Sequence, residues 1–113
     1  FSAKVMSLWT IPDADQIKAQ VAASKLKKVV VAGGGFIGLE LAENLLHLGF
    51  EVHLVEMMDQ VLAPLDPEMA RLVEAAMTAE GIKLHLKTGV SAFTENASTL
   101  LVSLSDGTTI EAD

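Results

Sequence analysis

Hydrophobic and polar positions follow one another along the chain in the order expected of a β-α-β-α-β unit. Residues 29–32 read Val-Val-Val-Ala, and an uninterrupted run of β-branched residues is typical of a parallel strand covered on both faces. An apolar stripe with a 3.6-residue period predicts a helix after that strand, and Gly49 is placed to end it. The next strand is predicted over 52–55, immediately before Glu56. The stripe of the helix comprises Ile37, Leu41, Ala42, Leu45 and Leu48.

A second helix and a third strand complete this unit. Asp66–Pro67–Glu68 predicts a helix start, because it combines a capping aspartate, a first-turn proline and an acid near the positive end of the helix dipole. Gly81 is expected to end the helix, and alternating apolar residues over 82–86 predict the third strand. The buried face of the helix is predicted to consist of Met69, Leu72, Val73, Ala76 and Met77.

The two flanks of the unit differ in character. Ile11–Pro12–Asp13 predicts the start of a modest helix that Asp13 caps and that ends near Leu26. Beyond the unit no helix fits, and Ser105–Asp106–Gly107 is a hairpin signal. The predicted fold is therefore α/β: a Rossmann-like, three-layer β-α-β-α-β unit followed by an antiparallel β-meander. The meander strands are predicted at 90–93, 99–104 and 109–111.

Composition narrows the class of protein. A chain of 113 residues suits a single domain. A formal charge of −7 argues against nucleic-acid and anionic-membrane partners, which need clustered cations. No apolar stretch is long enough for a transmembrane helix and no signal peptide is visible, so a cytoplasmic protein is expected. Because it has no cysteine, the chain carries no disulfide scaffold, Cys-ligated metal or cysteine nucleophile of its own.

Glycines at 33, 35 and 38 form a G-x-G-x-x-G motif between the first strand and its helix. Gly33 is expected to make the tight turn, Gly35 to let a pyrophosphate approach the backbone, and Gly38 to pack the helix against the strand. The free amides at the helix start would hold the anion. Glu56, at the end of the next strand, is placed to accept both hydroxyls of an adenosine ribose. The pattern indicates a dinucleotide site; the alternative is a glycine turn that only permits packing.

The sequence resembles a known family. VVVAGGGFIGLELAENLLHLGFEVHLVE, VLAPLDPEMA and EGIKLHLKTGV are similar to the NAD(P)H-binding domain of the FAD-dependent pyridine nucleotide-disulfide oxidoreductases. The similarity runs from about Ile11 to Asp113 and is strongest to the NADH oxidase, NADH peroxidase and coenzyme A-disulfide reductase branch. Ala32 stands where the family often has a larger aliphatic residue, a minor departure. A meander in place of a crossover helix is also a family trait.

The resemblance implies a larger parent enzyme. In such enzymes this domain lies within an FAD domain, the flavin passes electrons from NADH to a redox cysteine, and a third domain forms a homodimer. Here residues 1–26 would be a lead-in and N-terminal helix, and 27–113 the Rossmann-like core plus meander. A final parallel strand is expected after Asp113. No catalytic residue is expected in this chain, and the acceptor could be a disulfide, persulfide, peroxide or oxygen.

Three further residues are assigned to the cofactor site. By resemblance, Phe36 covers the nicotinamide pocket and Glu40 pairs with a lysine on the flavin side; the alternatives are a core phenylalanine and an exposed helix residue. Met57 would pack over the adenine or cover the sheet edge. The predicted cofactor-binding set is Gly33, Gly34, Gly35, Phe36, Ile37, Gly38, Glu40, Glu56 and Met57.

Other ionisable residues are predicted to have no chemical role. The three histidines, His47, His53 and His85, lack i, i+4 spacing and a carboxylate companion, so no metal site is expected. The acids Glu68, Glu74 and Glu80 are predicted to form a solvated helix face.

The cofactor is predicted to be NADH rather than NADPH. A 2′-phosphate needs nearby cations, yet no lysine or arginine occurs between Lys28 and Arg71, and Glu56 occupies the ribose position. Two readings from other classes stay open: a non-catalytic dinucleotide-sensing regulatory module, and an interaction domain that has lost its ligand. The β-rich stretch after Val90 disfavours the first, and the intact glycines disfavour the second.

Overall fold

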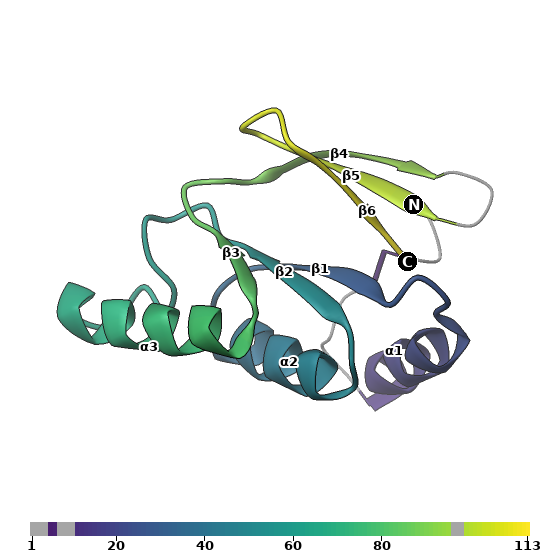
Figure 1. The fold of residues 1–113 in the computed structure, drawn as a ribbon, viewed down its shortest axis with the longest axis horizontal. Coiled ribbons are helices and arrows are strands. Elements are labelled where there is room, and N and C mark those ends of the chain that lie inside the picture. The colour runs from purple at the N-terminus through teal and green to yellow at the C-terminus, as the bar shows by residue number, and fades with distance from the viewer. Residues whose placement is uncertain (1–4, 7–10, 96–98) are drawn as a thin grey trace.

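The computed structural model describes residues 5–6, 11–95 and 99–113, and arranges them in three layers (Figure 1). A row of helices lies on one side of a parallel sheet, and an antiparallel sheet lies on the other. This confirms the predicted α/β fold with its meander. The elements are α1 (Ile11–Ala23), β1 (Lys28–Ala32), α2 (Phe36–His47), β2 (Glu51–Val55), α3 (Pro67–Glu80), β3 (Lys83–His85), β4 (Val90–Glu95), β5 (Leu100–Leu104) and β6 (Thr109–Ala112).

The parallel sheet has the strand order β1-β2-β3, with α2 and α3 as its two crossovers. Ala32 pairs with Val55, and Val55 pairs with His85, so the three strands end level with one another. The glycine loop after β1 and Glu56 after β2 consequently lie at the same carboxyl edge of the sheet. This is the edge at which open α/β sheets bind their ligands.

The antiparallel sheet has the order β4-β5-β6 and a register shift between Val90 and Ala92. The predicted hairpin joins β5 to β6: Gly107 has a φ of +89°, and its N–H donates to the carbonyl of Leu104 at 3.1 Å. A left-handed backbone of this kind favours glycine. The turn residues therefore define the hairpin as the sequence indicated.

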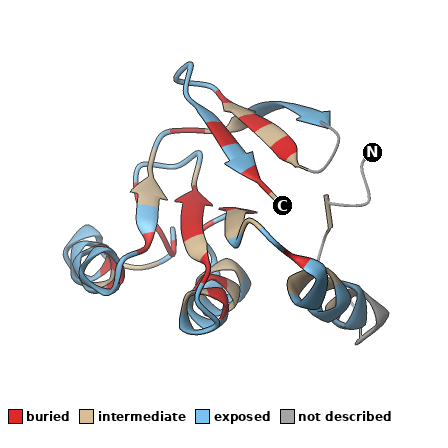
Figure 2. Cartoon of the chain, turned by 45° about the vertical axis from the view of Figure 1, so that its right-hand side comes forward, coloured by how far each residue is buried: buried red, intermediate tan, exposed pale blue. Residues whose placement is uncertain are grey.

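Two hydrophobic clusters hold the layers together (Figure 2). Odd and even residues of the parallel strands point to opposite faces, so Val52 and Leu54 pack under α2, whereas Val55 packs against the meander. Val102 and Ile110 supply the facing side chains of the second cluster. No helix in the described part of the chain is long and apolar enough to cross a membrane.

Helix ends and faces depart from prediction in three places. Helix α1 ends at Ala23 rather than near Leu26, because Lys27 adopts a φ of +59° and its N–H donates to the Ser24 hydroxyl, forming a turn. The prediction that Asp13 caps this helix is wrong, because α1 already begins at Ile11 and Asp13 lies within it. In α2, Ile37 and Leu48 are exposed at its two ends, and Ala42 and Leu45 form the buried stripe.

The buried face of α3 is also rotated from the predicted one. Ala70, Glu74 and Met77 are the buried residues, and Val73 is half-buried. Met69, Leu72 and Ala76 are exposed, with Leu72 66% accessible. The rotation follows from Glu74, whose carboxylate enters the interior to make hydrogen bonds that an apolar side chain could not provide.

Candidate dinucleotide-binding site

The three motif glycines each have a distinct geometric role. Gly33 has a φ of +110°, and its N–H donates to the carbonyl of Val55 at 2.8 Å, which turns the chain out of β1. A Cβ on Gly38 would lie 2.0 Å from the Gly33 carbonyl oxygen, so only glycine fits there. A Cβ on Gly35 would meet nothing within 4 Å. Open space beside Gly35, at the start of α2, is what an approaching phosphate requires.

Glu56 is held against the glycine loop by two backbone amides. Its Oε1 accepts from the Gly34 N–H at 2.7 Å and its Oε2 accepts from the Met58 N–H at 2.8 Å. The side chain is half-buried. Each carboxylate oxygen has a second lone pair, so the fixed carboxylate retains the capacity to accept two ribose hydroxyls. The Glu56 carboxylate also occupies the space beside Gly34, because a Cβ added to Gly34 would lie 3.1 Å from Oε1 of Glu56.

A loop over residues 57–65 supports this arrangement from the far side. The Leu62 N–H donates to the Gly34 carbonyl at 2.8 Å, and the Val61 N–H donates to Oε2 of Glu74 at 3.0 Å. Glu74 is only 6% exposed, and its Oε1 accepts from Arg71 at 2.6 Å. The prediction that Glu74 belongs to a solvated face is therefore wrong. The Glu74 carboxylate can be buried because the Val61 N–H and Arg71 both donate hydrogen bonds to it. The i, i+3 spacing of Arg71 and Glu74 was the one signal in the sequence.

The remaining predicted site residues are at the surface. Phe36 is 73% exposed at the start of α2, so the alternative of a core phenylalanine is wrong. Ile37 is exposed beside it, and Glu40 is exposed one turn further along the helix. Met57 is 78% exposed, with its Cγ 3.3 Å from where a Cβ on Gly89 would lie. The structure brings the glycines and Glu56 together with Met57 nearby, and leaves Glu40 on the outer face of α2.

Two cations follow the strands at this edge: Arg71, and Lys87, whose N–H donates to the Met58 carbonyl at 2.9 Å. Arg71 is the nearest in sequence to Glu56 on its C-terminal side, and it is engaged with Glu74 and with the Asp59 carbonyl at 3.3 Å. The glycine loop offers backbone N–H groups and the positive end of the α2 dipole instead. The charges of the site therefore suit a pyrophosphate held by amides and a ribose held by a carboxylate.

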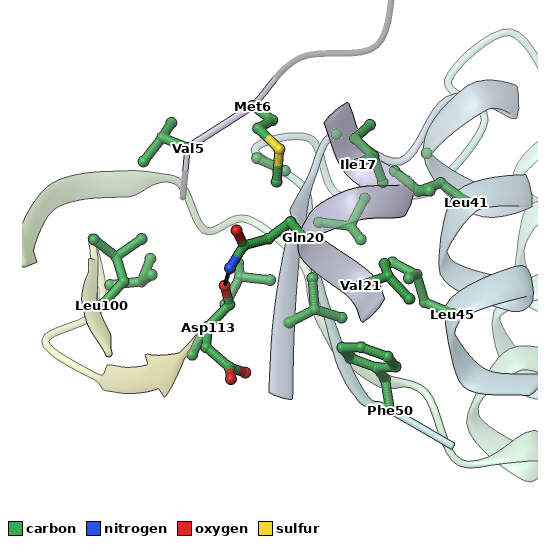
Figure 3. Close-up of a pocket in the computed structure, with 18 of the residues that line it drawn as sticks. Val5, Met6, Ile17, Gln20, Val21, Leu41, Leu45, Phe50, Leu100 and Asp113 are labelled. Atoms are coloured by element: carbon green, nitrogen blue, oxygen red, sulfur yellow. Dashed lines mark hydrogen bonds between the residues drawn. The ribbon is translucent and has the colours of Figure 1, made fainter. Parts of the chain in front are cut away.

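A mainly apolar cavity of about 680 Å³ lies beside β1, between α1 and the meander (Figure 3). Its walls come from α1, β1, α2 and the meander, and its rim includes Gly35 and Phe36. Gln20 donates to the Asp113 carbonyl at 3.0 Å across its wall. Glu56 does not line this cavity, so it is separate from the ribose position although both reach the glycine loop.

Asp113 closes the far end of this cavity. Its carboxylate accepts from the N–H groups of Lys25 at 2.9 Å and Leu26 at 2.8 Å, and its own N–H donates to the Lys28 carbonyl at 3.0 Å. Burial raises the pKa of Asp113, but these hydrogen bonds outweigh it and lower the pKa below its usual value. The contact ties the end of β6 to the start of β1.

Two histidines that the sequence left unconnected meet in the structure. His53 Nδ1 and His85 Nε2 are 3.0 Å apart, and His53 Nε2 lies 3.2 Å from a carboxylate oxygen of Glu51. The prediction that the histidines lack a carboxylate companion is therefore wrong. Burial lowers the pKa of His85, and the Lys83 ammonium and His53 lower the pKa of Glu51. Adjacent parallel strands place these residues on the sheet face that the meander covers.

Comparison with known proteins identifies the class and then the family. The fold and glycine loop are those of a Rossmann-type dinucleotide-binding domain, and residues 3–113 match the family described as "Pyridine nucleotide-disulphide oxidoreductase". The chain belongs to this family. An NADH oxidase of Methanocaldococcus jannaschii is 43% identical over 83 residues, which cover 73% of this chain and 18% of that protein.

Solved structures agree. The reduced CoADR-RHD of Bacillus anthracis is 42% identical with a TM-score of 0.87, covering 96% of this chain and 19% of that one. The water-forming NADH oxidase of Lactobacillus brevis, bound to NADH, is 26% identical with a TM-score of 0.91, covering 99% of this chain and 24% of that one. An engineered form of the latter, bound to NADPH, has lost an aspartate and gained two arginines among five substitutions; it is 26% identical with a TM-score of 0.88, over the same shares. The chain spans less than a third of the length of the relatives it matches.

Proposed function

We propose that this chain is the NAD(H)-binding domain of a flavin-dependent oxidoreductase and delivers NADH to an FAD bound elsewhere in the parent enzyme. The observation that carries the proposal is the pairing of an open backbone at Gly35 with a Glu56 carboxylate fixed beside it. Family membership supports the flavin as acceptor. The final acceptor would be a disulfide, persulfide, peroxide or oxygen, chosen by residues outside this chain.

The residues of the chain would bind and orient the cofactor. Amides at the start of α2 hold the pyrophosphate, and Glu56 accepts hydrogen bonds from the two ribose hydroxyls. Phe36, exposed at the mouth of the loop, covers the nicotinamide position until the cofactor enters. FAD, when bound in the parent enzyme, supplies the hydride acceptor. Glu40, exposed on the outer face of α2, is available to a lysine of the FAD domain.

The domain would prefer NADH to NADPH. A 2′-phosphate facing the Glu56 carboxylate at about 4 Å would meet a repulsion of about 4 kcal/mol per charge pair near a protein surface. A residual of about 1.4 kcal/mol after relaxation is tenfold in affinity. The similar NADH oxidase of Lactobacillus brevis supports a preference for NADH, because its engineered NADPH-bound form lost an aspartate and gained two arginines.

The free edge of β1 fits the further parallel strand that the family resemblance implies. Among the described residues β1 pairs with β2 on one side only, apart from two hydrogen bonds between Asp113 and Lys28 at its start. The cavity beside this edge is lined mainly by apolar side chains such as Val29, Ile17 and Leu100. A strand continuing from Asp113 would satisfy the edge and fill the cavity. The parent enzyme would then add its FAD and dimerisation domains and act as a homodimer.

Calorimetric titration of the chain with NADH tests the proposal. We expect saturable one-to-one binding that Gly35→Ala weakens at least about tenfold, because the added methyl group occupies the space that the phosphate needs. Glu68→Gln, an exposed residue in the first turn of α3 that makes no hydrogen bond to the glycine loop or Glu56 among the described residues, is the matched control and should bind as the unmodified chain does. The absence of saturable NADH binding, or equal binding by Gly35→Ala, would overturn the proposal.

A further inference from the structure

A cluster of three metal-ligating side chains lies outside the dinucleotide site. Glu43 and His47 stand one turn apart on α2, and Glu80 is the last residue of α3. One ligand atom from each of the three residues lies within 4.8 Å of the others. The helices meet at this point, since a Cβ on Gly81 would lie 4.0 Å from Leu46. Two separate elements therefore contribute to one cluster.

The position of the cluster favours a cation independently of its side chains. Helix α2 ends at His47 and α3 ends at Glu80, so the negative ends of two helix dipoles converge here. Neither last turn holds a lysine or arginine. Among the described residues no salt bridge involves Glu43 or Glu80. Two carboxylates and the ends of two helices thus stand together, and neither carboxylate has a salt-bridge partner among the described residues.

The ligand types identify the class of ion. Imidazole nitrogen suits Zn²⁺, Ni²⁺ and Cu²⁺, whereas Mg²⁺ and Ca²⁺ prefer oxygen alone. Ligand atoms about 2.0–2.2 Å from a tetrahedral Zn²⁺ are roughly 3.4 Å from one another. The three ligand atoms here lie within 4.8 Å of one another, and small rotations of their exposed side chains would bring them to that spacing.

We propose that Glu43, His47 and Glu80 bind a divalent transition-metal ion of the Zn²⁺ type, which clamps the carboxyl ends of α2 and α3 together. Three protein ligands leave a coordination position to water. The ion would stabilise the helix pair, because it binds the folded chain and not the separated helices. The proposal is independent of NADH binding, since the cluster lies at the opposite end of α2 from the glycine loop.

Titration of the chelator-treated chain with ZnCl₂ tests this site. We expect one-to-one binding and a higher melting temperature, with no comparable effect of MgCl₂. His47→Gln and Glu80→Gln should each weaken Zn²⁺ binding at least about tenfold, since even outer-shell partners of metal ligands typically contribute roughly 10–100-fold. Glu68→Gln, an exposed glutamate at the other end of α3, is the control and should change nothing.

A second measurement assigns the ligand directly. In an NMR titration the imidazole signals of His47 should shift with Zn²⁺, while those of His53 and His85 stay in place. Both variants remove exposed side chains, so circular dichroism should show an unchanged fold. Should either variant unfold, Glu43→Gln takes its place with the same expected loss. Absence of binding, binding unchanged in these variants, or a shift centred on His53 and His85 would overturn the proposal.

Discussion

At the residue scale, the glycine motif is the part of the site that the sequence predicts best. Each of its glycines answers a local requirement of the backbone: a left-handed turn at Gly33, open space at Gly35 and close packing at Gly38. The positive φ of Gly33 and the close packing at Gly38 favour glycine whatever the ligand, whereas the space at Gly35 matters only to an approaching phosphate, and both kinds of requirement leave glycines in the sequence. Glu56 follows from its place at the end of β2. What could not be predicted is its fixing by the Gly34 and Met58 amides, which depends on the loop conformation.

The glycines give a prediction that separates folding from binding. Gly38→Ala should lower the free energy of unfolding by about 1–3 kcal/mol, because its Cβ would overlap the Gly33 carbonyl oxygen. Gly35→Ala should leave it within about 1 kcal/mol, because its Cβ meets nothing. Urea denaturation of the two variants measures both. Equal loss of stability in the two variants would contradict the assigned roles.

Glu74 shows what residue-level reasoning missed. Its burial depends on hydrogen bonds from the Val61 N–H and from Arg71. The apolar periodicity of a helix cannot show that the N–H of a distant loop will donate to one of its side chains. Glutamate is almost never buried unless paired, so a solvated position was the expectation for an acid on a predicted surface helix.

We therefore expect Glu74→Ala to destabilise the chain by about 1–3 kcal/mol, the cost of leaving a buried N–H without its acceptor. Glu68→Ala, in the exposed first turn of the same helix, should stay within about 0.5 kcal/mol. Thermal denaturation with both variants checks the difference. If Glu74→Ala proved as mild as Glu68→Ala, the buried carboxylate would not be supporting the loop.

At the element scale, the order and type of the helices and strands follow from periodicity, whereas register and rotation do not. The face of α3 turned from the predicted one because Glu74 displaced apolar residues from the interior. The pairing of Val55 with His85 sets His53 and His85 side by side. Nothing in either strand alone specifies that register, so the histidine pair is a product of sheet assembly.

The histidine pair gives a pH prediction. Burial lowers the pKa of His85, so the unfolded chain takes up its proton more readily than the folded one does. Stability from this residue is therefore complete above the ordinary histidine pKa of about 6.5 and declines as the pH falls from there toward the lowered pKa of the folded state. His85→Gln should flatten the dependence of unfolding free energy on pH between 7 and 5, roughly the window above ordinary carboxyl pKa values. An unchanged slope would contradict it.

At the scale of the whole molecule, the three-layer arrangement was predictable because strand and helix patterns alternate and then stop at the meander. The cavity beside β1 was not, since it is bounded by α1 and by strands 70 or more residues later in the chain. It lies beside the edge of β1 that does not pair with β2.

The chain by itself should not consume NADH. Hydride transfer needs an acceptor held in contact with the nicotinamide, and under the proposed function that acceptor, FAD, would be bound outside this chain. We expect NADH absorbance to stay constant over hours with the purified chain in air. Steady NADH consumption that scales with chain concentration, without added flavoprotein, would contradict this assignment.

The most direct test of the central claim is a paired titration of the chain with NADH and NADPH under identical conditions. We predict that NADH binds at least about tenfold more tightly, because the Glu56 carboxylate accepts from the ribose hydroxyls and repels a 2′-phosphate. Glu56→Ala should bring the two affinities together, chiefly by weakening NADH. Equal affinity of the unmodified chain for both cofactors, or no binding of NADH at all, would contradict the account.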